Sequence, residues 1–342
     1  MGQRPAQNTE QHAEHAEHAE RPEHAEHAEQ SARPEPTPFA LGLPVNLARL
    51  PRRVGGVELL KISAPAVGER REEGAPPAAD PVSGARVARL LNIGNALAYG
   101  GEMGMPEWVM LDCGLLPTTF MGLCRRAADL APRARASLNE RLARLEATLP
   151  ESRARAERRL GVPRGPLRDD EWVPVAEFCA LPTLTPGQVM GYSLFSLERG
   201  LGVRAKALGL ALHGALGARA QLGVAQYSNT AALRAHLRFG PLELLDPLTP
   251  LHTRAGETFI YRLALPPEDA LIDMAAGSRL RYTPHEPSPL GALIEERWLR
   301  ADELEGWAAL RAATQAGDLR AALTGARHTA LGDAEVLVAT YR

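Results

Sequence analysis

The sequence predicts a mixed fold of strands and helices, of the α+β class, and three observations lead to this prediction. Between residues 56 and 265, short apolar runs of strand length alternate with longer runs of helical periodicity. Two strand-like runs, 172–181 and 188–197, flank the turn Thr185-Pro186-Gly187, which favours an antiparallel pair. The second run leads into a glycine-containing turn at 199–204, followed by an apolar helical run. We therefore expect a sheet covered by helices.

The composition is that of a soluble globular protein. The chain has 342 residues, of which 45% are hydrophobic and 23% are charged, and this length fits one large domain or two smaller ones. A net charge of -2 gives no global reason to expect binding to nucleic acid or to a membrane. The three cysteines form no CxxC pair, and no apolar run reaches the ~18 residues of a membrane helix. We expect a cytoplasmic protein that is not secreted.

The first 38 residues are expected to form a disordered tail. The triplet HAE recurs there and almost no bulky apolar residue precedes Phe39, so burial cannot offset the loss of chain entropy. Two interpretations of its histidines stay open. Imidazole is a ligand of zinc, nickel and copper, whereas compositional bias of this kind more often indicates a repeat without specific chemistry. The histidines of the repeat are His12, His15, His18, His24 and His27.

Strand and helix signals begin after this tail. The apolar runs 56–63, 107–116 and 118–124 have the length and composition of strands. Between the first two runs, Asp80 is a favourable N-cap for a helix that should end at Gly100. These elements should form the first part of the sheet and one helix beside it.

A charged helical region is expected from residue 131 to 159. Its leucines recur on one helical face while Glu and Arg cover the rest, which is typical of an amphipathic surface helix, and a break is expected near Pro150. Its arginines indicate a solvated face rather than an RNA site. We treat residues 131–170 as a helical insertion that ends in a linker at 163–170.

The run from Leu201 to Ala215 predicts an apolar helix. Gly209 and Gly214 lie inside it, and each costs about 1 kcal/mol relative to alanine, so we expect close packing there. Ser228 or Asn229 should cap a second, shorter helix that ends at Phe239-Gly240-Pro241. Later elements are strands at 220–224, 242–245, 258–265 and 335–341 and a helix at 304–323.

The turn that begins the apolar helix is the strongest indication of a binding site. It contains Arg199, Gly200, Gly202 and Arg204, and it lies between the end of a strand and the start of a helix. Helix N-termini carry unpaired N–H groups and a partial positive charge, and glycines let a phosphate approach the backbone closely. We therefore expect a phosphate-containing ligand at this turn.

From Leu194 to Arg204 the sequence resembles a motif of the GNAT superfamily of acyl-CoA N-acyltransferases. The family pattern V-x-P-x-x-R-G-x-G-x-G/A keeps its Arg-Gly-x-Gly core here at Arg199, Gly200 and Gly202. Ser196 stands where the family has proline. Arg204 stands where the family has glycine or alanine, and it either crowds a bound pyrophosphate or adds a charge-assisted contact to it.

Residues 229–241 resemble a second element of the same family, N-x-x-A-x-x-L-Y-x-K-x-G-F. Asn229, Ala232, Arg238 and Gly240 fall in register with it. His236 takes the place of a tyrosine that returns a proton to the leaving thiolate of coenzyme A in the family. A histidine of near-neutral pKa can donate a proton, and the alternative is a half-buried structural histidine.

The resemblance implies a mixed, mostly antiparallel sheet that opens beside the strand at 188–197, where the pantetheine arm would lie. It implies an acyl-CoA-dependent N-acyltransferase that transfers an acetyl or other acyl group to an amine of a small molecule or peptide, and a catalytically inert acyl-CoA-binding module is the alternative. The domain would span 39–265, with 266–342 as a helical extension. The residues expected to bind coenzyme A are Leu197, Arg199, Gly200, Gly202, Val203, Arg204 and Asn229.

The resemblance also implies a general base that removes a proton from the amine. Glu177 is one candidate because it interrupts the apolar run 172–181, and Asp112 is another. A carboxylate that points to solvent, or that is paired at a strand end, would give the same pattern. His236 and Glu177 are thus the expected catalytic residues, with no metal ion expected.

Overall fold

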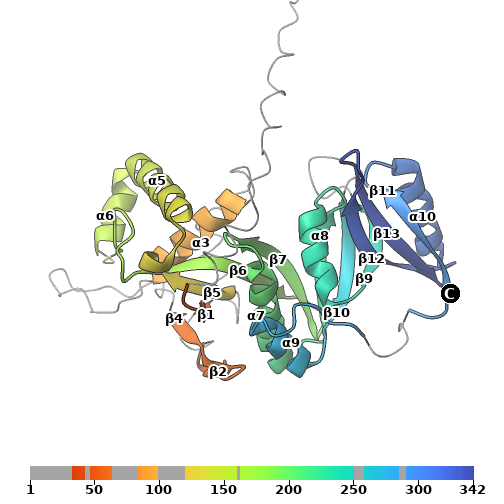
Figure 1. The fold of residues 1–342 in the computed structure, drawn as a ribbon, viewed down its shortest axis with the longest axis horizontal. Coiled ribbons are helices and arrows are strands. Elements are labelled where there is room, and N and C mark those ends of the chain that lie inside the picture. The colour runs from red at the N-terminus through yellow and green to blue at the C-terminus, as the bar shows by residue number, and fades with distance from the viewer. Residues whose placement is uncertain are drawn as a thin grey trace, which may run out of the picture. The chain divides into compact units, whose positions relative to one another are not determined.

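A sheet of eleven strands organises the chain, as the computed structural model shows (Figure 1). The structure describes residues 33–42, 47–63, 84–98, 120–159, 162–249, 258–284 and 290–342. The chain divides into two units, Met1–Glu35 and Pro36–Arg342, and the sheet belongs to the second. Several expected features lie outside the described residues, namely the histidine repeat, the Asp80 cap, the strand at 107–116 and Asp112.

The strands are short and follow the apolar runs of the sequence. Their bounds are β1 (Thr37–Gly42), β2 (Arg53–Val54), β3 (Val57–Glu58), β4 (Leu60–Ser63), β5 (Phe120–Arg126), β6 (Trp172–Pro182), β7 (Gln188–Ser196), β8 (Ala220–Gln226), β9 (Leu242–Thr249), β10 (Thr258–Ala264), β11 (Leu293–Arg300), β12 (Arg320–His328) and β13 (Ala334–Tyr341). The helices are α3 (Gly84–Ala98), α5 (Pro132–Thr148), α6 (Glu151–Arg159), α7 (Leu201–Ala215), α8 (Thr230–His236), α9 (Glu268–Ala275) and α10 (Leu304–Ala316).

The expected mixed, mostly antiparallel sheet is confirmed. Its strand order is β11-β13-β12-β9-β10-β8-β7-β6-β5-β1-β4, while β2 and β3 form a separate small hairpin. Within the large sheet β7 pairs with β8 in parallel and β1 pairs with β4 in parallel. The other neighbours are antiparallel. A parallel pair between β7 and β8 requires a crossover, and α7 provides it.

The hairpin expected around Thr185-Pro186-Gly187 is confirmed by the antiparallel pairing of β6 with β7. The N–H of Thr183 donates to the carbonyl of Gln188 across the turn at 3.2 Å. Gly187 has φ = 76°, a left-handed conformation that glycine adopts without strain. Local turn chemistry therefore sets the antiparallel direction of these two strands.

Helices α7 and α3 cover opposite faces of the sheet at β6. Phe178 and Cys179 are consecutive strand residues, so their side chains point to opposite faces. Phe178 faces α7, because a Cβ added to Gly209 would lie only 2.4 Å from its ring. Cys179 packs with Val87 of α3. The close packing expected from Gly209 is confirmed, and α9 packs on α7 to form an outer layer.

The charged region beyond β5 forms two helices, with the expected break at Pro150 between α5 and α6. Leu138 and Leu142 are its buried face. Buried ion pairs connect this region to α3: the Arg86 guanidinium lies 2.7 Å from Glu171, and Arg89 pairs with Glu157. The insertion is therefore packed against the sheet domain through α3.

The C-terminal region differs from the expectation of a helical extension. Helix α10 ends at Ala316 and does not reach Leu323, because Gly317 adopts a left-handed conformation with φ = 77° that caps the helix. Residues from Arg320 onward form β12, which pairs with β9. With β11 and β13, this region adds three strands to the edge of the sheet.

Candidate functional site

The parallel strands β7 and β8 pair over a short distance and then diverge. Their pairing runs from Gln188 opposite Ala220 to Met190 opposite Leu222. No further pairing between them occurs among the described residues, although β7 continues to Ser196. Each strand keeps its outer neighbour, β6 or β10, along its length. Beyond Met190 and Leu222, the backbone N–H and C=O groups on the facing edges of β7 and β8 are therefore not paired with each other.

A β-bulge lies where the strands diverge. The register between β6 and β7 shifts between Cys179 opposite Ser193 and Ala180 opposite Gly191, so β7 carries Tyr192 as an extra residue. A bulge bends the strand that carries it and increases its twist. The bulge thus turns the second half of β7 away from β8.

The glycine turn connects the diverging end of β7 to α7. Gly200 is the N-cap of α7 with φ = 84°, and no side chain caps this helix. The N–H of Leu201 donates to the carbonyl of Glu198 at 3.3 Å, and the hydroxyl of Ser196 donates to the same carbonyl. The N–H groups of the first helical turn have no acceptor within the helix. They are therefore suited to bind an anion.

A buried ion pair holds this turn in place. The Arg125 guanidinium of β5 donates to both carboxylate oxygens of Glu198, with Nε at 3.0 and 3.1 Å and Nη2 at 3.0 Å. The two side chains are only 8% and 7% exposed. Two-point contacts of this kind fix orientation as well as position. No local pattern could have predicted this pair, because its two residues are 73 positions apart in the chain.

Arg204, which departs from the family pattern, extends away from the turn. Its Nε donates to the carbonyl of Ala275 at the end of α9 at 3.0 Å. A Cβ added to Gly277 would lie 3.4 Å from the same nitrogen, so the guanidinium packs against this segment. Arg199, by contrast, is exposed at the turn, and Leu197 is half-buried behind it.

Asn229 is the N-cap of α8, which settles the choice between Ser228 and Asn229. Its Oδ1 accepts a hydrogen bond from the N–H of Ala232 at 3.0 Å. At the other end of this helix, His236 contacts Lys206 of α7, with 2.6 Å between Nδ1 and Nζ. Lys206 is fully buried, while His236 keeps 8% of its surface exposed. The sequence patterns above did not single out Lys206, although a lysine inside a largely apolar helical run is a signal that could have identified it.

Polar side chains connect His236 to the point of divergence. The imidazole ring lies 5.5 Å from the Tyr261 ring between centroids. The Tyr261 hydroxyl accepts a hydrogen bond from Nε2 of Gln221 at 3.2 Å. The Gln221 amide in turn covers Gly191, where an added Cβ would lie 2.3 Å from Nε2. The structure therefore brings His236 and the start of the opening together.

Glu177 lies on the other face of the sheet, beside Cys179, and is fully buried. Burial raises the pKa of this carboxyl to about 8, and the nearby Ser193 hydroxyl of β7 opposes the increase. Neither carboxylate oxygen makes a hydrogen bond among the described residues. A carboxyl with a pKa near neutrality can exchange protons at physiological pH. The structure places it one strand away from the opening and not beside His236.

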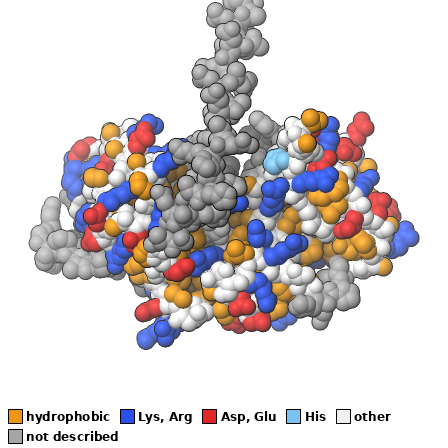
Figure 2. Space-filling view, viewed as in Figure 1, with side chains coloured by type: hydrophobic (Ala, Val, Ile, Leu, Met, Phe, Trp, Pro, Cys, Tyr) orange, Lys and Arg blue, Asp and Glu red, His pale blue; other side chains and the backbone are white. Residues whose placement is uncertain are grey.

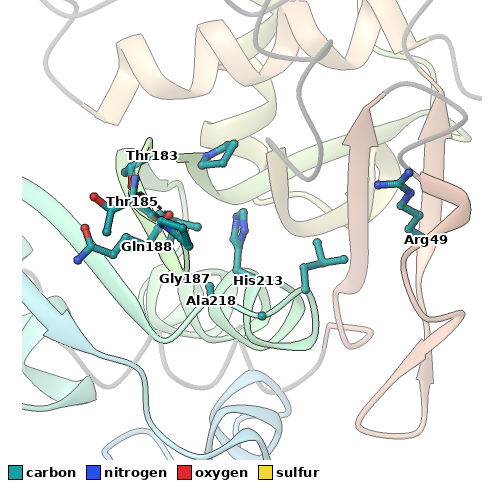
Figure 3. A pocket seen from close by; sticks show the side chains of 12 residues that line it. Arg49, Thr183, Thr185, Gly187, Gln188, His213 and Ala218 are labelled. Carbon is teal, nitrogen blue, oxygen red and sulfur yellow. Dashed lines mark hydrogen bonds between the residues drawn. The ribbon is translucent and has the colours of Figure 1, made fainter.

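A cavity of about 320 Å³ lies at the opposite end of α7 from the glycine turn. Figure 3 shows His213 of α7 on one side of it and Thr183, Thr185 and Gln188 of the β6–β7 hairpin on the other. A helix of this length spans about 22 Å at 1.5 Å per residue, which separates the cavity from the turn. It is therefore distinct from the candidate site.

The described residues contain neither a metal-binding cluster nor a helix that could span a membrane. No group of three or more His, Cys, Asp and Glu side chains in these ranges is arranged to hold a metal ion. None of the helices in the same ranges combines the length with the hydropathy that crossing a bilayer requires.

Comparisons with known proteins add little to this geometry. No family model matches the chain, and no curated protein matches it. A crystal structure from Desulfovibrio desulfuricans, described as an acetyltransferase of the GNAT family, superposes with a TM-score of 0.26 and 19% sequence identity, over 42% of this chain and 98% of that chain. This TM-score is too low to support a function.

Proposed function

We propose that the chain is an acyl-CoA-dependent N-acyltransferase of the GNAT type, which transfers an acetyl or other acyl group to an amine. The observation that carries this proposal is the divergence of β7 from β8 at a bulge, directly before an uncapped glycine turn. A strand with an open backbone edge and a helix N-terminus at its end suit a ligand with an amide-containing arm and a phosphate group.

The residues at the turn fit a pyrophosphate. Gly200 has no heavy atom within 4 Å of an added Cβ, so the backbone there is accessible. The N–H groups of Gly202 and Val203 would donate to phosphate oxygens, and the exposed Arg199 would add charge. Arg204 lies in the first turn, where a cation is unfavourable beside the positive end of the helix dipole. A bound pyrophosphate would relieve this repulsion without a direct contact to Arg204.

Leu197 and Asn229 complete the expected set of residues that bind coenzyme A. Leu197 packs behind the turn, and Asn229 orients α8 by capping it. Backbone groups of β7 that face the opening would pair with the amides of the pantetheine arm, as a strand pairs with a sheet edge. We expect these residues to position the ligand, while His236 and Glu177 handle protons.

Acyl-CoA would supply a thioester whose carbonyl carbon is attacked by the amine. Glu177 would accept the proton that the amine loses, and Ser193 lies on the strand between this carboxyl and the opening. His236 would return a proton to the departing thiolate from the other face. Acid and base would thus act from opposite faces of the sheet, which keeps them from neutralising each other.

A second candidate is a module that binds acyl-CoA without turnover. The complete burial of Glu177 favours it, because a base must reach the amine from which it takes a proton. The two candidates share the same ligand and differ only in turnover.

Thermal unfolding with coenzyme A, beside release of free thiol from acetyl-CoA over a panel of amines, separates the two candidates. Stabilisation with thiol release supports the enzyme, and stabilisation without release supports the binding module. Gly202→Val tests the turn, because an added Cβ would lie 3.3 Å from Ser196. Gly214→Ala, near the other end of α7, is the matched control. No stabilisation by coenzyme A, or equal stabilisation of both variants, would contradict the proposed site.

A further inference from the structure

Lys206 and His236 form a buried pair of basic groups without an acidic counter-ion. Burial lowers the pKa of Lys206, and burial followed by the charge of Lys206 lowers the pKa of His236. No carboxylate contributes to either shift among the described residues. The Lys206 ammonium instead lies over the rings of Phe239 and Phe178, at 5.0 and 5.9 Å. Polar groups that are buried without compensation call for a functional explanation.

The contact between Nζ and Nδ1 is compatible with two proton arrangements. When Lys206 is an ammonium it donates to Nδ1, and the neutral imidazole carries its proton on Nε2. When Lys206 is a neutral amine it accepts from Nδ1–H, and Nε2 carries no proton. The pair can thus change between these forms by moving protons along one line, without moving a side chain.

Only one member of the pair is accessible. Lys206 has no exposed surface, whereas His236 retains a small exposed fraction. The contacts of His236 lead through Tyr261 and Gln221 to Gly191, where β7 leaves β8. Tyr261 is the titratable group that faces the pair from the sheet, where its ring lies beside His236. Phe178 and Phe239 are the apolar neighbours of Lys206. Among the described residues the imidazole is the hydrogen-bond partner of Lys206, so it offers a route by which a proton can leave Lys206.

We propose that Lys206 is a positioning residue that supplies protons through His236 to the thiolate released in the acyl transfer proposed above. As the Nε2 proton passes to sulfur, the ammonium of Lys206 gives a proton to Nδ1. The imidazole stays neutral and changes tautomer, Lys206 becomes a neutral amine, and the coenzyme leaves as a thiol. A proton from solvent then enters at Nε2 and returns the pair to its first form.

The surroundings of Lys206 suit this role. An exposed lysine holds its proton too strongly to give it up readily at neutral pH. Around Lys206, burial and the absence of a described carboxylate lower the pKa of the amine, so the ammonium gives up its proton more readily. The pair therefore replaces a tyrosine with a donor that can be reloaded from solvent.

Lys206→Met removes the amine and keeps an unbranched side chain of similar length. We expect kcat with acetyl-CoA to fall about 100-fold at unchanged KM, and the pH profile to lose the limb that reports the pair. When the acyl donor is an acetyl thioester of a more acidic aryl thiol, the departing thiolate needs no proton. The rate of acetyl transfer from this donor should therefore be the same in Lys206→Met and in the native protein. His236→Phe should give the same loss, and the double variant should lose no more than either single variant. Equal losses for both thioesters would show a merely structural role and overturn the relay.

A measurement on the unmodified protein keeps the inference testable if the variants do not fold or if no acceptor amine is found. Nitrogen-15 NMR of the imidazole should show the proton of His236 on Nε2 at lower pH and on Nδ1 at higher pH, because the two forms of the pair differ in this tautomer. An imidazole that keeps one tautomer across the titration of the pair would overturn the relay and leave the acyltransferase proposal standing. A change of tautomer that persists in Lys206→Met would overturn it equally. Failure to bind coenzyme A would overturn both.

Discussion

Arg125 and Glu198 form a two-point ion pair that ties the glycine turn to a strand on the far side of β6. Glu198 lies between Leu197 and Arg199, in the segment expected to hold a pyrophosphate. Because Gly200 and Gly202 leave this segment intrinsically adaptable, the ion pair supplies the rigidity that the glycines remove. The turn is thus fixed by a distant residue and not by its own sequence.

Arg125→Met should therefore weaken both the fold and the site. It leaves the Glu198 carboxylate buried without its cation, and we expect a loss of about 3–5 kcal/mol in the free energy of unfolding. Arg144→Met is the matched control, because its ion pair with Glu140 is exposed and should contribute less than about 1 kcal/mol. Chemical denaturation measures both variants. Similar losses in the two would show that the buried pair does not stabilise the turn.

Two glycines inside α7, Gly209 and Gly214, should respond oppositely to alanine. Gly209→Ala places a Cβ 2.4 Å from the Phe178 ring, and overpacking of this kind costs about 1–3 kcal/mol. Gly214→Ala meets only Leu265 at 3.8 Å and should gain up to about 1 kcal/mol from helix propensity. Thermal unfolding of the pair checks the prediction. A destabilised Gly214→Ala would mean that the helix does not pack on the sheet as described.

Local sequence signals predicted the turns and most of the helices and strands. The features that could not be predicted depend on contacts between residues far apart in the chain. The hairpin at Thr185-Pro186-Gly187 and the Asn229 cap follow from residues that act on their own backbone, so the sequence was sufficient there. The Lys206–His236 pair joins two helices, and no pattern in either one reports the other. The prediction of a helix through Leu323 was wrong beyond Gly317, because the short apolar run 321–323 suits a helix or a strand equally.

Glu177 should make the protein less stable as the pH rises. The carboxyl has an ordinary value of 4.5 and a pKa of about 8 in the fold, so between these values the unfolded chain loses a proton that the fold keeps. The contribution of Glu177 to the free energy of unfolding is therefore greatest below pH 4.5, and it falls as the pH rises to about 8. Glu177→Gln should remove this dependence and gain about 3–5 kcal/mol over the native protein at pH 8. Denaturant titrations at several pH values measure the difference between the two proteins, and a constant difference would contradict the burial of a titrating carboxyl.

Lys206 should produce the opposite slope, which separates its effect from that of Glu177. The pKa of Lys206 is lowered well below 10.5, so between the lowered pKa and 10.5 the unfolded chain binds a proton that the fold does not take. The contribution of Lys206 to the free energy of unfolding is therefore greatest above pH 10.5, and it decreases as the pH falls toward the lowered pKa.

The double variant Lys206→Met/His236→Phe replaces both bases with apolar groups, which leaves no unpaired Nδ1. We expect the double variant to be more stable than the native protein by about 1–4 kcal/mol at pH 7. This gain should shrink as the pH approaches 10.5, where lysine is neutral in both states. Chemical denaturation at pH 7 and near pH 10 measures the change, and a gain that is equal at both would show that the fold does not lower the pKa of Lys206.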